Sequence, residues 1–165
     1  MKIIKALLLL TIVIGVSSCT KDNQDPERIY AITANVDGTA TTFNTNVTGT
    51  TGSANGTIVT AIQAKTSDGS TISVTINGEL VAGKTYSAAV VGATLQPVIQ
   101  FTSGADVYVN NTVGANLVSV TVTEVSDTFI EGTFKGDLTT VAVGGVAVKT
   151  KAITNGIFTA KLKKQ

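Results

Sequence analysis

The chain has 165 residues, and its 12 Lys and Arg against 11 Asp and Glu give a formal net charge of only +1. This balance gives no electrostatic reason to expect nucleic acid as a partner. Histidine and tryptophan are absent, and there is a single cysteine. These absences exclude Ser-His-Asp and Cys-His catalysis, zinc sites built on His or Cys, and haem or iron–sulfur ligation. Calcium binding by oxygen ligands survives these exclusions, but no EF-hand spacing supports it, so we expect no cofactor and no metal.

The N-terminal segment has the pattern of a signal peptide. Lys2 and Lys5 accompany an apolar run over residues 6–16, which is shorter than the about 20 apolar residues that cross a bilayer. The run ends in Val16-Ser17-Ser18-Cys19, which resembles the bacterial lipobox. The resemblance implies that residues 1–18 are removed and that Cys19 becomes a lipidated N-terminus. With an ordinary secretory signal, Cys19 would be an unpaired thiol in an oxidising compartment, which is uncommon. A buried structural cysteine also fits less well, because a polar segment follows directly.

Residues 20–26 are polar and end in proline, which is typical of a flexible tether. Lys21, Asp22 and Asp25 resemble the sorting signal that follows the lipidated cysteine in surface lipoproteins of Bacteroidota-type bacteria, although Asn23 and Gln24 interrupt its acidic run. A merely solvated linker is the alternative. We therefore expect a tether over residues 19–28 and a protein anchored in the outer membrane, on the cell surface or on the periplasmic face.

From residue 29 onward the hydrophobic period is two. Val118, Val120 and Val122 alternate with hydroxyl-bearing residues, and residues 71–76 alternate in the same way. Strict alternation predicts half-buried antiparallel strands, and the chain's 28 threonines agree with this prediction. Strands are expected at residues 29–36, 39–45, 57–65, 70–77, 84–91, 97–102, 105–109, 116–124, 128–135, 139–143, 146–151 and 153–162.

Turn signals separate these strands. Asn-Gly and Asp-Gly pairs favour tight hairpin turns, and they begin at Asp37, Asn55, Asp68, Asn77 and Asn155. Pro97 should mark an edge or a strand start, and residues 44–56 are expected to form a long loop. The regular spacing predicts one all-β domain over residues 29–165, an antiparallel meander β-sandwich or flattened β-barrel. The expected core comprises Ile32, Ile62, Ile72, Val74, Ile76, Phe101, Val120, Val122, Ile130, Phe134, Phe158 and Leu162.

The order of these segments resembles an uncharacterised family of small, Flavobacterium-like outer-membrane and surface lipoproteins of Bacteroidota type. The matching segments are the lipobox, residues 34–38 (ANVDG), residues 130–134 (IEGTF) and residues 153–158 (ITNGIF). The resemblance implies an all-β fold and a surface or outer-membrane location. It brings no catalytic residues.

Two charged groups are candidates for chemistry. Glu124, Asp127 and Glu131, with Asp106 or Asp137 from neighbouring loops, could supply paired carboxylates for glycoside hydrolysis or calcium binding; solvated turn residues are the alternative. Alternation also places Lys149 with Lys151, and Lys161 with Lys163, on common outer faces. This lysine stripe could bind an anionic glycan or lipid head groups, or it could simply protect a strand edge.

Three function classes remain, and none has a specific motif. Because most of the usual catalytic side chains are missing, we expect a non-catalytic binding or accessory module for a glycan, a peptide or an envelope component. The alternative is a structural envelope or matrix lipoprotein. A carboxylate-dependent glycosidase is less favoured. The tyrosines at positions 30, 86 and 108 could stack on sugars, but with eight aromatic residues in all the core is their expected place.

Overall fold

A computed structural model describes residues 28–87, 97–110, 117–140 and 148–165. In these residues the chain forms strands joined by turns, and no helix there is long and apolar enough to span a bilayer. The strands are β1 (Ala31–Val36), β2 (Thr39–Phe43), β3 (Thr45–Ala54), β4 (Thr57–Lys65), β5 (Thr71–Asn77), β6 (Thr85–Ser87), β7 (Val98–Ser103), β8 (Asp106–Asn110), β9 (Ser119–Val125), β10 (Phe129–Thr140) and β11 (Thr150–Lys164).

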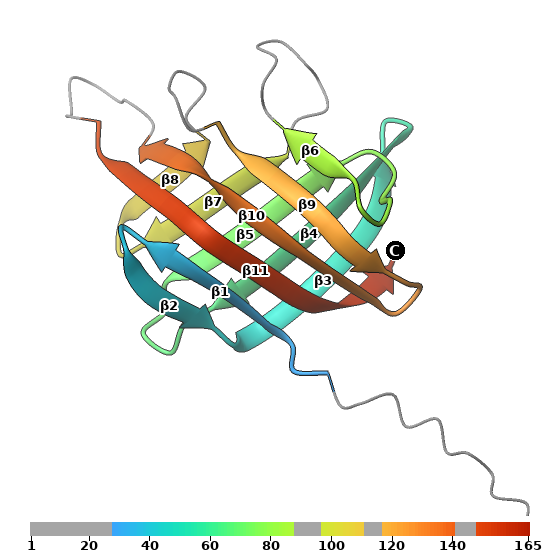
Figure 1. The fold of residues 1–165 in the computed structure, drawn as a ribbon, viewed down its shortest axis with the longest axis horizontal. Helices are drawn as coiled ribbons and strands as arrows, with labels where there is room; N and C mark the ends of the chain where they lie inside the picture. The colour runs from blue at the N-terminus through green and yellow to red at the C-terminus, as the bar shows by residue number, and fades with distance from the viewer. Residues whose placement is uncertain (1–27, 88–96, 111–116, 141–147) are drawn as a thin grey trace, which may run out of the picture.

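The strands form two crossing layers (Figure 1). The front layer has the order β2-β1-β11-β10-β9-β6, and the back layer is the meander β3-β4-β5-β7-β8. The long strands β10 and β11 join the layers, because the end of β10 pairs with β8 and the end of β11 pairs with β3. Seven strands therefore close into a flattened barrel, which confirms the predicted all-β fold class. The β11–β3 pair is parallel, whereas the other pairs are antiparallel.

The core lies between the two layers and is built from the inward half of each alternating strand. The twelve core residues expected from the sequence are all buried. Phe43 adds an edge-to-face contact with Phe101, with ring centroids 6.2 Å apart. The hydroxyl of the buried Thr60 is hydrogen-bonded to that of Thr51 at 2.7 Å, so this polar group in the core has a partner.

Glycine makes room for the aromatic side chains between β10 and β11. Gly132 is paired with Phe158, and Phe134 is paired with Gly156. A Cβ atom at Gly132 would lie 2.4 Å from Cζ of Phe158, and one at Gly156 would lie 2.7 Å from the ring of Phe134. Each ring therefore occupies the space that a side chain on the neighbouring strand would fill.

The tight hairpins are confirmed where two residues separate paired strands. Asp37 and Gly38 both have positive φ between β1 and β2, and Asn55 and Gly56 do so between β3 and β4. The backbone of both pairs fits a turn that matches the strand twist. Pro97 immediately precedes β7, as a proline at a strand start should.

The expected long loop over residues 44–56 is wrong. Residues 45–54 form β3, which pairs with β4 along most of its length. Asn46 takes a positive φ of 54°, and the register shifts between Thr45 and Thr48. This irregularity lets a segment rich in Thr, Asn and Gly join the sheet despite its weak alternation.

The prediction of a turn at Asn155-Gly156 is also wrong, because β11 runs through this pair. Two residues of β11, Thr154 and Asn155, lie opposite Lys135, since the register passes from Phe134–Gly156 to Gly136–Ile153. Asn155 has φ 51°, which identifies a β-bulge in place of a hairpin. The gap between the expected strands at 128–135 and 139–143 likewise lies within β10. The strands expected at 84–91 and 139–143 extend beyond the described residues, as does the start of the one at 146–151.

Candidate functional site

A row of hydroxyl-bearing residues crosses the outer face of the front layer. The row follows the register of six neighbouring strands and has one apolar member, Ile157, whose exposed fraction is 52%. At one end, the hydroxyls of Thr85 and Thr121 are hydrogen-bonded at 2.8 Å. In strand order the row comprises Thr42, Thr33, Ile157, Thr133, Thr121 and Thr85.

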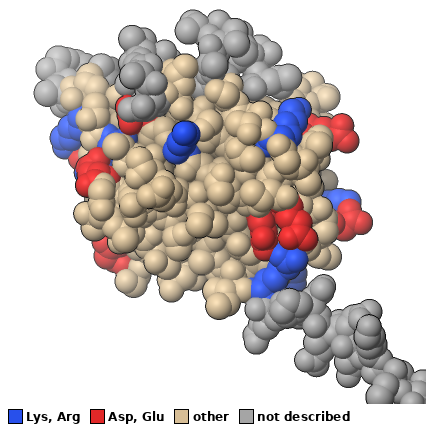
Figure 2. All heavy atoms as spheres, viewed as in Figure 1, with Lys and Arg blue, Asp and Glu red and all other residues tan. Residues whose placement is uncertain are grey.

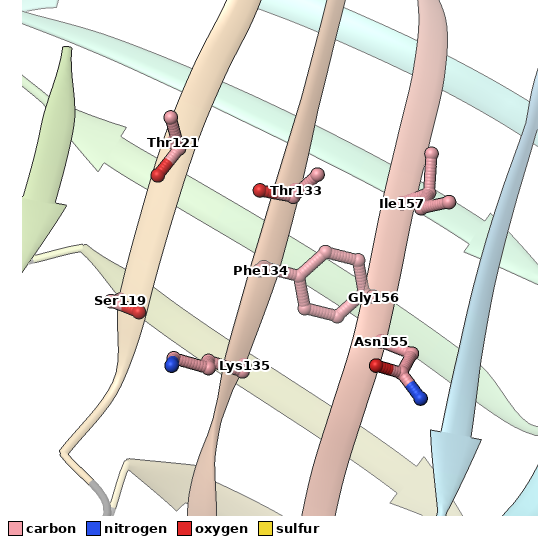
Figure 3. A pocket seen from close by; sticks show the side chains of 8 residues that line it. All are labelled: Ser119, Thr121, Thr133, Phe134, Lys135, Asn155, Gly156 and Ile157. Carbon is pink, nitrogen blue, oxygen red and sulfur yellow. The ribbon is translucent and has the colours of Figure 1, made fainter.

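Two adjoining hollows lie on this face. The first, of about 450 Å³, is lined by residues of β9, β10 and β11, which Figure 3 shows from close by. The second, of about 430 Å³, continues it and shares Ser119 and Lys135. Together they form a groove, named here the front groove. Its first hollow is lined by Ser119, Thr121, Thr133, Phe134, Lys135, Asn155, Gly156 and Ile157.

The bulge in β11 shapes the middle of the front groove. Because Gly156 has no side chain, the ring of Phe134 fills the space that a side chain there would take, and it reaches the lining of the groove beside Asn155. Gly136 has φ 151°, and a Cβ atom on it would lie 2.6 Å from Val118. Bulges are over-represented beside binding and catalytic sites because they re-aim side chains. Here the bulge places the Asn155 amide at the groove.

Charge is sparse on the front face. Figure 2 shows the charged side chains mainly around its rim, with one basic side chain nearer the middle of the face. The ammonium group of Lys135, in the lining of both hollows, makes no ion pair or hydrogen bond within the described part of the chain. Asp137 lines the second hollow. No signal in the sequence marked Lys135, apart from its place in the outward half of an alternating strand.

Two of the predicted stripe lysines are bound to carboxylates. Lys149 Nζ lies 2.7 Å from Oδ2 of Asp106, and Lys151 Nζ lies 2.5 Å from Oδ2 of Asp37. These hydrogen bonds raise the pKa of both lysines and lower the pKa of both aspartates, and the backbone N–H of Ala152 lowers that of Asp37 further. Lys161 and Lys163 are exposed on β11. These two lysines of the stripe form no ion pair with a described carboxylate.

The predicted carboxylates divide between two places. Glu124 and Glu131 are directly paired across β9 and β10, and the Arg28 guanidinium contacts both of them. The guanidinium also lies 3.5 Å from the ring centroid of Phe129. Arg28 lies three residues before β1, so this Arg28 cluster fastens the segment that leads into β1 to the end of the β9–β10 hairpin.

The remaining carboxylates do not join that pair. Asp127 forms an ion pair with Lys164, Asp106 is bound to Lys149, and Asp137 belongs to the front groove. Within the described ranges no three Asp, Glu or Cys residues are grouped so as to hold a metal ion. The arrangement therefore offers one carboxylate pair, Glu124 with Glu131, and that pair is already occupied by a cation.

Tyr86 and Tyr108 are buried, as expected for the core, whereas Tyr30 is 36% exposed. They lie on different strands or outside them and form no stacking platform of the kind considered for sugars. Cys19, Lys21, Asp22 and Asp25, on which the lipid and sorting predictions rest, lie outside the described residues.

A separate polar hollow of about 540 Å³, named here the back hollow, lies on the outer face of the back layer. Its lining includes Lys65, Gln63 and Gln100 with several hydroxyl-bearing residues, and its apolar members, Ala64 and Ile72, are buried.

Comparisons of the chain with protein-family models, with curated proteins and with solved structures give no match.

Proposed function

We propose that the protein is a lipid-anchored outer-membrane lipoprotein displayed on the cell surface, that its β domain is a non-catalytic binding module, and that the front groove is its ligand site. The observation that carries this proposal is the front groove itself. Two adjoining hollows lie on a hydroxyl-rich face with one exposed apolar side chain, Ile157. Binding sites commonly combine such an apolar surface with a few placed polar groups.

The attachment point of the domain supports this function. The chain enters the domain at Arg28, which contacts Glu131 on β10. Lys135 lies four residues further along that strand, roughly 13 Å away at the usual rise of a β-strand. A lipid on Cys19 would thus hold the domain from the hairpin end and leave the front groove accessible.

The lining favours a glycan among the expected ligands. Hydroxyl and amide groups from Ser119, Thr133 and Asn155 can both donate and accept hydrogen bonds, and Ile157 can contact the apolar C–H face of a sugar ring.

A binding assay with a matched pair of variants tests the proposal. The purified full chain in detergent is applied to an array of glycans, peptides and envelope components at low salt. Thr133→Val removes a groove hydroxyl at nearly constant volume, and Thr75→Val does the same on the outer face of β5. We expect binding that Thr133→Val weakens and Thr75→Val preserves. The absence of any bound component would refute the binding module.

A structural role is the second candidate, because strand β2 lies at one edge of the front layer. Its sequence, TATTF, contains neither a charged residue nor proline, the features that usually protect an edge from pairing. If the protein assembles through this edge, sedimentation will show concentration-dependent oligomers that Ala40→Lys abolishes. A monomer at all concentrations would reject this role.

A further inference from the structure

Lys135 lies where the two hollows of the front groove meet. It lines both of them, with Ser119 on β9 to one side and Asn155 on β11 to the other (Figure 3). The bulge in β11 sets two residues opposite Lys135. Figure 3 shows the ammonium group directed toward Ser119, with the Asn155 amide on the opposite side of the Lys135 side chain, so all three groups of this lining can bind the same ligand.

The charges around Lys135 favour a ligand with a negative group. Arg28, Lys149, Lys151 and Lys164 are each in an ion pair, whereas Lys135 has no such partner among the described residues. Asp137 follows Lys135 by two residues on the same strand, which corresponds to about 7 Å at the usual rise of a β-strand. It lines only the second hollow, so an anionic group fits best in the first hollow, beside Thr133 and Asn155.

The hydroxyl groups and the one apolar side chain of the row on the front face indicate what the rest of the ligand should offer. The threonine row continues on both sides of the first hollow across six strands, which corresponds to about 24 Å at the usual strand spacing. It offers hydroxyl groups, and its only apolar member is Ile157. A linear polymer with hydroxyl groups, apolar ring faces and carboxylates would match this surface in shape and in charge.

The hollow on the back layer fits such a ligand less well. It also contains a lysine, Lys65, but its apolar lining residues are buried. A sugar ring would therefore find hydrogen bonds there and no exposed apolar surface.

From these observations we infer that the front groove binds an acidic glycan, with a uronate carboxylate on the ammonium group of Lys135. This inference rests on the proposed function, because it names the ligand class of the same site. The carboxylate accepts hydrogen bonds from Lys135 and from a neighbouring hydroxyl, while adjacent sugars lie along the threonine row.

The test compares polymers that differ only in their carboxyl groups. Polygalacturonate, alginate and hyaluronan are each titrated into the full chain in detergent, beside the same polymers after chemical reduction of their carboxyl groups. Dextran sulfate and polyglutamate represent polyanions without uronate. Lys135→Gln is compared with Lys65→Gln and Lys163→Gln, which remove lysines from the back hollow and from the stripe.

We expect at least one uronate polymer to bind, its reduced form to bind at least tenfold more weakly, and Lys135→Gln to weaken binding about tenfold or more. The two control variants should bind like the wild type. Equal binding of the reduced polymers would overturn the inference and leave the binding module standing.

Three other results would also overturn the inference. The first is a loss of binding in Lys65→Gln or Lys163→Gln with Lys135→Gln unaffected, since it would place the site elsewhere. The second is equal binding of polyglutamate or dextran sulfate, since it would reduce recognition to bulk charge. The third is no binding of any uronate polymer, and if the wider array then shows another ligand, the binding module still holds.

Discussion

Replacing Gly132 by alanine tests the packing between β10 and β11. The new Cβ atom would lie 2.3 Å from the backbone oxygen of Thr121 and 2.4 Å from Cζ of Phe158. The first atom belongs to the backbone of a paired strand, so side-chain rotation cannot relieve the contact. Overpacking of this kind costs about 1–3 kcal/mol.

Alanine also lowers the conformational entropy of the unfolded chain, which raises the free energy of unfolding by about 0.4–1 kcal/mol. We therefore expect Gly132→Ala to lower the free energy of unfolding by a net amount of roughly 1–2 kcal/mol. Gly52→Ala is the matched control, because a Cβ atom there meets nothing closer than Cβ of Gln165 at 3.8 Å. Its stability should be unchanged or slightly raised.

Urea unfolding of both variants and the wild type measures these differences. The double variant Gly132→Ala/Phe158→Leu should lose less than the sum of its single variants, because leucine withdraws the ring atoms from the new methyl group. If Gly132→Ala unfolds at the same urea concentration as Gly52→Ala, the pairing of Phe158 with Gly132 is wrong.

Three further predictions follow from the fold and the N-terminal segment. Lys151 and the backbone N–H of Ala152 lower the pKa of Asp37 in the folded state. The contribution of Asp37 to the stability of the folded state is therefore present above the unfolded carboxyl pKa of about 3.9, and it is lost as the pH falls through the folded pKa. Urea midpoints of Asp37→Asn should therefore vary less between neutral pH and pH 3 than those of the wild type. Val74→Ala should cost roughly 2–4 kcal/mol in the same assay, and an unchanged midpoint would mean that the register of β5 is wrong. Cys19→Ser should abolish labelling with a clickable fatty acid, and label on the serine variant would overturn the lipobox assignment.

The alternation of apolar residues was sufficient to predict the inward faces of the strands. Val120 and Phe134, for example, are buried as the alternation predicts, because each strand has one face in the core. Local pattern failed at residues 45–54 and at Asn155-Gly156. At both places an asparagine with positive φ forms a bulge inside a long strand, and only the pairing with neighbouring strands distinguishes such a bulge from a turn.

The candidate site could not be predicted for the same reason. The front groove brings together Ser119, Lys135 and Asn155 from three strands, and their register depends on that bulge. The sequence drew attention to the lysine-rich C-terminal strands. The carboxylates of Asp37 and Asp106, distant in the chain, meet two of those lysines, while the lysine in the groove has no local pattern of its own.

Protease treatment of intact cells tests most directly the claim that this domain is displayed for binding outside the cell. We expect added protease to degrade the wild-type domain while a periplasmic control protein survives. Replacing Lys21, Asp22 and Asp25 by alanine should preserve acylation and protect the domain. A wild-type domain that resists the protease until the outer membrane is opened would contradict surface display.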